Sequence, residues 1–188
     1  MENTALIVLD LINGITESEH YKPYLIRHQV MIKANQLIAY ARKKHYLIIF
    51  VKVGFSDQYV ELAHRSPLFI QNKIHGRLKL SEKSTDFAAD LDYHAEDIVM
   101  IKHRINAFYG TALEAILQTN DIQNLILCGV STNLAVEGTA RDAHDRNYHV
   151  IVAEDACGTT DEENQEKSLS LLRLIAEVKK VREICQEE

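Results

Sequence analysis

Short apolar runs recur along this chain, and a longer amphipathic or polar segment separates each run from the next. The runs cover residues 5–9, 46–53, 98–101, 125–130, 150–153 and 176–178. Apolar runs without polar alternation are typical of strands that are covered on both faces, as in a parallel sheet. Because parallel strands need crossover connections, the pattern predicts a Rossmann-like α/β fold. We expect a three-layer sandwich around a mostly parallel, six-stranded sheet.

The segments between the runs predict helices over residues 24–44, 111–119, 131–146 and 162–174, with a last helix at the C-terminus. Residues 54–95 differ, because they are irregular and longer than an ordinary connection. We therefore expect a lid or an interface loop there. The length of 188 residues suits a single domain over residues 1–188.

The composition argues against several classes of partner. The formal net charge is -6 and no run of Lys and Arg stands out, so we expect no nucleic acid partner. No apolar run approaches the length of a membrane span, and the first is too short for a signal peptide, so we expect no membrane partner. The cysteines, Cys128, Cys157 and Cys185, lack metal or disulfide-framework spacing, which favours free thiols and a cytoplasmic location.

Polar residues follow three of the predicted strands. Asp10 follows the first run, Lys102 follows the run 98–101, and Ser131 follows the run 125–130. Taken singly, each has a simple explanation as a capping residue or a solvated charge. In a parallel sheet, however, the carboxyl ends of the strands share one edge, where ligands bind. A carboxylate and an ammonium brought together in a dry cleft hold each other ionised and can exchange a proton with a substrate.

The segment after the run 125–130 is suited to an anion site. Ser131, Thr132 and Asn133 are residue types that cap helices, and the small residues that follow allow a helix to lie close to a sheet. Backbone N–H groups at the start of a helix attract negative charge. A substrate oxyanion is therefore expected beside residues 131–135.

Three ordered motifs carry a resemblance to a known family. They are Asp10, the segment Lys-His-Arg-Ile-Asn-Ala-Phe that begins at Lys102, and Gly-Val-Ser-Thr-Asn followed by Thr-Ala-Arg-Asp-Ala within residues 129–143. In these motifs the chain resembles the isochorismatase-like hydrolase superfamily, also called the cysteine hydrolases. The resemblance implies a thiolate nucleophile activated by Asp10, charge stabilisation by Lys102 and a backbone oxyanion hole. It also implies a cis peptide bond at Val130–Ser131 and a homo-oligomer, either a dimer or a tetramer.

The chain departs from the family pattern at the nucleophile, because the position of the catalytic cysteine is Ala135. Three explanations stay open. The protein can be a hydrolase that works without a thiol, as true isochorismatases do on a vinyl ether. It can be an amidohydrolase of the carbamoyl, ureido or nicotinamide type whose cysteine has been replaced by Ala135, or a non-catalytic binding protein. The first is favoured, since retaining Asp10 and Lys102 leaves an acid/base pair for chemistry on a small polar substrate.

The remaining expectations concern contacts in the pocket. Residues near the motifs are candidates for binding substrate: Asn13, Phe108, Tyr109, Val130, Ser131 and Leu134. Core packing is an equally good role for Phe108. The resemblance also extends to metal-binding nicotinamidases, but their close Asp-x-His pair is absent here, where only Asp57, His64 and His75 could converge. We therefore expect no metal and no other cofactor.

Overall fold

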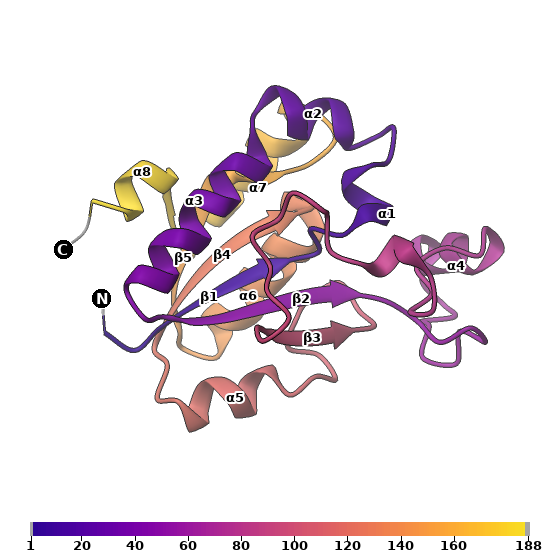
Figure 1. Cartoon of the computed structure of the whole chain (residues 1–188), viewed down its shortest axis with the longest axis horizontal. Coiled ribbons are helices and arrows are strands. Elements are labelled where there is room, and N and C mark those ends of the chain that lie inside the picture. The colour runs from indigo at the N-terminus through magenta and orange to yellow at the C-terminus, as the bar shows by residue number, and fades with distance from the viewer. Residues whose placement is uncertain (1, 187–188) are drawn as a thin grey trace.

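The computed structural model describes residues 2–186 and is built around a six-stranded sheet in the order β3-β2-β1-β4-β5-β6 (Figure 1). The strands are β1 (Thr4–Leu9), β2 (Leu47–Val53), β3 (Ile98–Lys102), β4 (Asn124–Val130), β5 (His149–Gly158) and β6 (Glu177–Lys179). All neighbouring strands run parallel, which confirms the α/β fold expected from the apolar runs. β5 extends well beyond the predicted run at residues 150–153.

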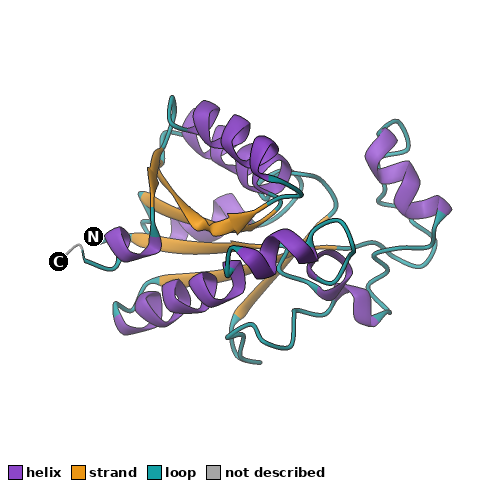
Figure 2. Ribbon diagram, turned by 90° about the horizontal axis from the view of Figure 1, so that it is seen from above, coloured by secondary structure: helices purple, strands orange, loops and turns teal. Residues whose placement is uncertain are grey.

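Helices cover both faces of this sheet (Figure 2). They are α1 (Asn13–Thr16), α2 (Lys22–Arg27), α3 (Val30–Lys43), α4 (Pro67–Ile74), α5 (Leu113–Thr119), α6 (Glu137–Asp145), α7 (Glu162–Leu172) and α8 (Val181–Ile184). In Figure 1, α3 lies in front of the sheet, whereas α6 and α7 lie behind it. All six side chains of β1 are buried, as expected for a central strand covered on both faces. No helix within residues 2–186 is long and apolar enough to cross a membrane.

The helix expected over residues 24–44 is two helices, so this prediction was wrong in its extent. α2 ends at Arg27, and α3 begins at Val30. Between them Gln29 adopts a left-handed backbone conformation with φ 54°, which a continuous α-helix cannot contain. No glycine or proline lies at this break, so no local signal predicts it.

The segment 54–97, here called the arm, is also more regular than expected, because it contains α4. Ser66 and Pro67 start this helix, although we expected residues 54–95 to be irregular. The Ser66 hydroxyl caps the helix by accepting from the Phe69 N–H. Figure 2 shows α4 projecting away from the sheet. A second small core anchors the arm to the end of β2, and it comprises Ile12, Val53, Phe55, Tyr59, Leu62, Phe69 and Leu78.

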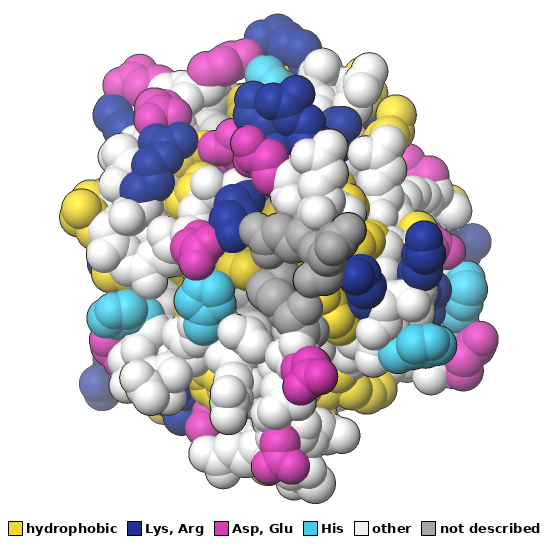
Figure 3. All heavy atoms as spheres, turned by 90° about the vertical axis from the view of Figure 1, so that its left-hand side faces the viewer, with side chains coloured by type: hydrophobic (Ala, Val, Ile, Leu, Met, Phe, Trp, Pro, Cys, Tyr) yellow, Lys and Arg dark blue, Asp and Glu magenta, His cyan; other side chains and the backbone are white. Residues whose placement is uncertain are grey.

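The face that carries the chain termini has mixed charge. Figure 3 shows acidic and basic side chains interspersed there, with apolar side chains in small separate groups. The cavity described below lies elsewhere, at the carboxyl ends of the central strands. These ends are where the sheet brings the sequence motifs together.

Candidate active site

The strand register brings the three motif-bearing segments to one edge of the sheet. Leu9 at the end of β1 pairs with Gly129 in β4, and Val53 at the end of β2 pairs with Lys102 in β3. β1 connects onward to β2 on one side, whereas β4 connects to β5 on the other, so the strand order reverses between β1 and β4. Asp10 therefore lies at the point where parallel α/β sheets bind ligands.

Gly129 allows β1 and β4 to approach closely at this point. Its φ is 123°, a conformation that side chains disfavour, and a Cβ atom there would lie 2.0 Å from the Leu9 carbonyl oxygen. A residue with a side chain would push the strands apart. The glycine thus sets the spacing between Asp10 and the turn that follows β4.

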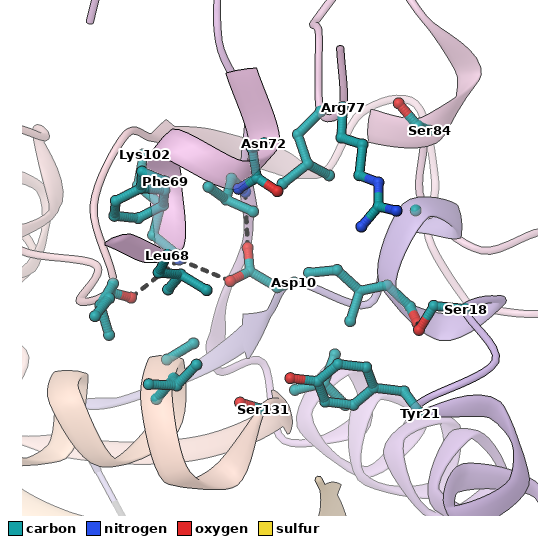
Figure 4. A pocket seen from close by; sticks show the side chains of 18 of the residues that line it. Asp10, Ser18, Tyr21, Leu68, Phe69, Asn72, Arg77, Ser84, Lys102 and Ser131 are labelled. Carbon is teal, nitrogen blue, oxygen red and sulfur yellow. Dashed lines mark hydrogen bonds and ion pairs between the residues drawn. The ribbon is translucent and has the colours of Figure 1, made fainter. Parts of the chain in front are cut away.

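Asp10 and Lys102 form a buried ion pair, with 2.7 Å between Lys102 Nζ and Asp10 Oδ2 (Figure 4). Their side chains are 4% and 2% exposed. The Val53 N–H donates to the other carboxylate oxygen, Oδ1, at 2.7 Å. Lys102 Nζ also donates to the carbonyl oxygens of Arg104 and Ile105, each at 3.0 Å. All three hydrogens of the Lys102 ammonium group therefore have acceptors. These contacts hold the Lys102 side chain and the Asp10 carboxylate in fixed positions.

The environment shifts the proton affinity of this carboxyl. Burial raises the pKa of Asp10, and the nearby Lys102 charge and the hydrogen bonds from Lys102 and Val53 offset that rise only in part. A carboxyl group whose pKa lies closer to neutrality keeps its proton in a larger fraction of molecules. Such a group can act as a general acid as well as a base.

The turn after β4 closes the site from the other side. The Val130–Ser131 peptide bond is cis, as the resemblance implied, and a π-helical turn, Thr132–Val136, then leads into α6. Ser131 makes no side-chain capping hydrogen bond, which corrects the capping role expected from its residue type. Thr132 instead donates to Gln165 Oε1 at 2.7 Å in α7, so a second helix fixes the turn.

A cavity of about 630 Å³ opens between these groups and the arm. Asp10 and Lys102 line it from the strand ends, and Val130, Ser131, Leu134 and Ala135 line it from the turn. Side chains of the arm and of the segment around α1 complete the wall, among them Tyr21, Phe69, Asn72, Arg77 and Ser84. Figure 4 shows the Asp10 carboxylate directed into this space. Its size suits a small molecule.

The family follows from comparison with known proteins, because a family model described as an isochorismatase domain matches residues 4–183. The chain belongs to the isochorismatase family. It is 35% identical over 184 residues to the isochorismatase family protein YecD of Escherichia coli O157:H7, covering 97% of this chain and 95% of that protein. It is 31% identical over 180 residues to the ureidoacrylate amidohydrolase RutB of Acinetobacter baylyi, covering 83% and 71% of the two chains.

Solved structures agree with this assignment. An isochorismatase family protein of Burkholderia thailandensis superimposes with a TM-score of 0.84 at 28% identity, covering 99% of this chain and 96% of the other. The family resemblance inferred from Asp10, Lys102 and the turn after β4 is thereby confirmed. The amidohydrolase name of one relative indicates hydrolytic chemistry within the family.

The structure of this isochorismatase-family protein brings six of the nine proposed site residues together at the cavity: Asp10, Lys102, Val130, Ser131, Leu134 and Ala135. It places the other three elsewhere. Asn13 donates through Nδ2 to the Lys83 carbonyl and so ties α1 to the arm. Phe108 is buried against the Tyr148 ring, and Tyr109 is 64% exposed.

Several cavity residues were not anticipated from the sequence, notably Tyr21, Asn72 and Arg77. Asn72 and Arg77 reach the cavity because the arm folds back over the strand ends, which no local motif encodes. Within residues 2–186 no group of three or more His, Cys, Asp and Glu side chains is arranged to hold a metal ion. Of the three residues considered for metal, Asp57 accepts a hydrogen bond from Ser81 and His75 lines the cavity.

Proposed function

We propose that this protein hydrolyses a small enol ether by general acid catalysis at Asp10, without a covalent intermediate. The observation that carries the proposal is the pairing of a buried carboxyl of raised pKa with an alanine at the family's nucleophile position, in one cavity. Ala135 has no atom that can attack a substrate. Asp10 and Lys102 keep the geometry that proton transfer needs.

The proposed reaction is balanced by one water molecule. Protonated Asp10 gives its proton to the terminal carbon of the enol ether, which leaves a positive charge shared by the adjacent carbon and the ether oxygen. Water adds to that carbon and returns a proton to Asp10, and the resulting hemiketal breaks into a ketone and an alcohol. Lys102 does not touch the substrate in this scheme. It positions the carboxyl group, and the backbone of residues 131–135 stabilises the developing negative charge during the breakdown.

Neither strand cysteine is suited to replace the missing nucleophile. Cys128 and Cys157 are buried within β4 and β5 and are not among the cavity-lining residues. Burial raises the pKa of Cys128 to about 12 and also raises that of Cys157. Since the thiolate is the reactive form, both groups are inert at neutral pH.

A second candidate is an amidohydrolase lineage in which the cysteine has become Ala135. The similarity to the ureidoacrylate amidohydrolase RutB favours it. In that case the present chain binds a ureido, carbamoyl or related amide without cleaving it. A binding protein without activity would behave in the same way, so turnover by the unaltered chain separates the first candidate from both others.

The test is a hydrolysis assay with isochorismate, the enol ether for which the family is named. We expect turnover by the unaltered protein and a loss of about 100-fold or more in the Asp10→Asn variant. Asp145→Asn is the matched control, because that carboxylate lies at the end of α6 with its side chain 82% exposed. Failure of the unaltered protein to cleave isochorismate and simpler enol ether acids, or full activity of Asp10→Asn, would refute the proposal.

A further inference from the structure

The turn after β4 has two sides that meet different surroundings. Ser131, Leu134 and Ala135 line the cavity. Thr132 is fully buried on the other side of the turn and is not among the lining residues. Behind it lies α7, which contributes the buried side chain of Gln165 and none of whose residues lines the cavity. The turn is therefore supported from behind by a helix that does not itself reach the cavity.

The side-chain amide of Gln165 is held in one orientation by its two hydrogen bonds. Its Nε2 donates to the Glu154 carbonyl in β5 at 3.3 Å, and a carbonyl can only accept. The Oε1 atom therefore faces the turn, where it accepts from the Thr132 hydroxyl at 2.7 Å. Through Gln165, the backbone of the central sheet thus holds the first residue of the π-helical turn.

Two other contacts hold the same segment less directly. Asn133 accepts from the Thr159 hydroxyl at 2.9 Å, but Asn133 is exposed, so water competes for this hydrogen bond. Ser168 Oγ lies 2.6 Å from Glu137 Oε2 and 3.3 Å from the Thr132 carbonyl oxygen. Its single hydrogen goes to the nearer, charged acceptor, which belongs to α6. The hydroxyl of Thr132 therefore makes the most enclosed side-chain contact of the turn.

We propose that Gln165 is a positioning residue, which acts through Thr132 to fix the direction of the backbone N–H groups of residues 131–135. Donors stabilise developing charge best when their direction is set before the reaction. A π-helical turn departs from regular α-helical hydrogen bonding, so neighbouring contacts contribute more to holding its shape. The inference rests on the proposed function for the role of these N–H groups, but how firmly they are held can be measured without turnover.

The test is amide hydrogen exchange of the protein without ligand, followed by NMR. The probes are the N–H groups of Leu134 and Val136, which both donate to the Ser131 carbonyl at 3.2 Å. We expect both to exchange about 10-fold or more faster in Thr132→Val and in Gln165→Met, because each variant leaves one partner of a buried hydrogen bond unsatisfied. Thr132→Ser keeps the hydroxyl and should keep the exchange rates of the unaltered protein.

The matched control is Thr85→Val in the arm. Thr85 is also fully buried, and its hydroxyl lies 3.2 and 3.1 Å from the carbonyl oxygens of Lys79 and Glu82. Its loss should lower the unfolding temperature without accelerating exchange at the turn. The double variant Thr132→Val/Gln165→Met should accelerate exchange no more than the larger single effect, since both changes remove the same contact.

The outcomes separate this inference from the proposed function. Unchanged exchange at the turn in Thr132→Val and Gln165→Met, equal acceleration in Thr85→Val, or additive effects in the double variant overturns the positioning role. None of these results depends on cleavage of an enol ether.

Activity gives a second readout that a merely structural role would not move. If the unaltered chain cleaves an enol ether, Thr132→Val should lower kcat about 10-fold and change KM by less than about two-fold, because misdirected N–H groups stabilise the transition state less. Thr132→Ser should restore kcat. An unchanged kcat with a raised KM would assign the contact to substrate binding and overturn the positioning role.

Discussion

The buried pair Asp10–Lys102 makes a quantitative prediction for stability. At the 2.7 Å separation of Lys102 Nζ and Asp10 Oδ2, the gross attraction is about 6 kcal/mol for an effective dielectric constant of about 20. Desolvation of both ions opposes this attraction, but removing only one partner leaves an uncompensated buried charge, which costs about 3–5 kcal/mol. Asp10→Asn and Lys102→Met should each lower the free energy of unfolding by that amount.

The double variant Asp10→Asn/Lys102→Met should be more stable than the sum of the single effects predicts, by at least about 2 kcal/mol, since no buried charge remains. Lys102→Met also removes the hydrogen bonds that Lys102 donates to the Arg104 and Ile105 carbonyls. This loss of stability occurs in both the single and the double variant, so it cancels when the two are compared. The assay is urea unfolding of the four proteins at pH 8, followed by circular dichroism. Additivity within about 0.5 kcal/mol would show that the two charges do not act as a pair.

Three further predictions follow from the same site. Gly129→Ala should lose more than about 2 kcal/mol of stability, because its Cβ would meet the Leu9 carbonyl at 2.0 Å. Gly110→Ala is the control, because Gly110 also has a positive φ, 69°, but a Cβ there would meet no atom within 4 Å. It should lose only about 1 kcal/mol of stability. Equal losses for the two variants in urea unfolding would contradict the argument that β1 and β4 approach closely at Gly129. If the chain descends from an amidohydrolase, Ala135→Cys should create a thiol that reacts with iodoacetamide and should gain amidase activity. Intact mass measures the reaction with iodoacetamide, and ammonia release measures the amidase activity. Because burial raises the pKa of Asp10, kcat/KM for an enol ether should fall as pH rises through that pKa, and a rate that instead rises with pH would assign Asp10 the role of a base.

The raised pKa of Asp10 also determines how the stability of the folded protein changes with pH. A carboxyl whose pKa is raised on folding binds its proton more tightly in the folded state, so its contribution is most favourable at low pH. That contribution is lost as pH increases from the ordinary value of 3.8 through the raised pKa of Asp10. The Asp10→Asn variant should lack this component of the pH dependence of unfolding.

The sequence predicted the sheet well because its signal is local. Uninterrupted apolar runs specify buried parallel strands wherever they occur, and the positions of Asp10, Lys102 and Ala135 follow from motifs at strand ends. The break at Gln29 could not be predicted, since a left-handed residue that is neither glycine nor asparagine leaves no mark in the sequence. The start of α4 does have a local signal, since Ser66 is a capping residue type and Pro67 suits the first helical position.

The site was harder to predict, because proximity in sequence does not give side-chain direction. Phe108 is the last residue of the motif that begins at Lys102, but it is not among the residues that line the cavity and instead stacks on Tyr148. Arg77 lies in no motif, and it reaches the cavity only because Phe55 and its neighbours fold the arm back over the strand ends. Long-range packing of this kind is not encoded in any short pattern.

The most direct test of acid catalysis without a covalent intermediate is a single-turnover experiment with enzyme in excess over isochorismate. Samples are quenched over time, and the product and the intact protein mass are measured together. The account predicts that product forms while the protein mass stays unchanged at every time point, and that Asp10→Asn forms none over the same period. A protein adduct that rises and decays with product formation, or a wild-type rate in Asp10→Asn, would contradict it.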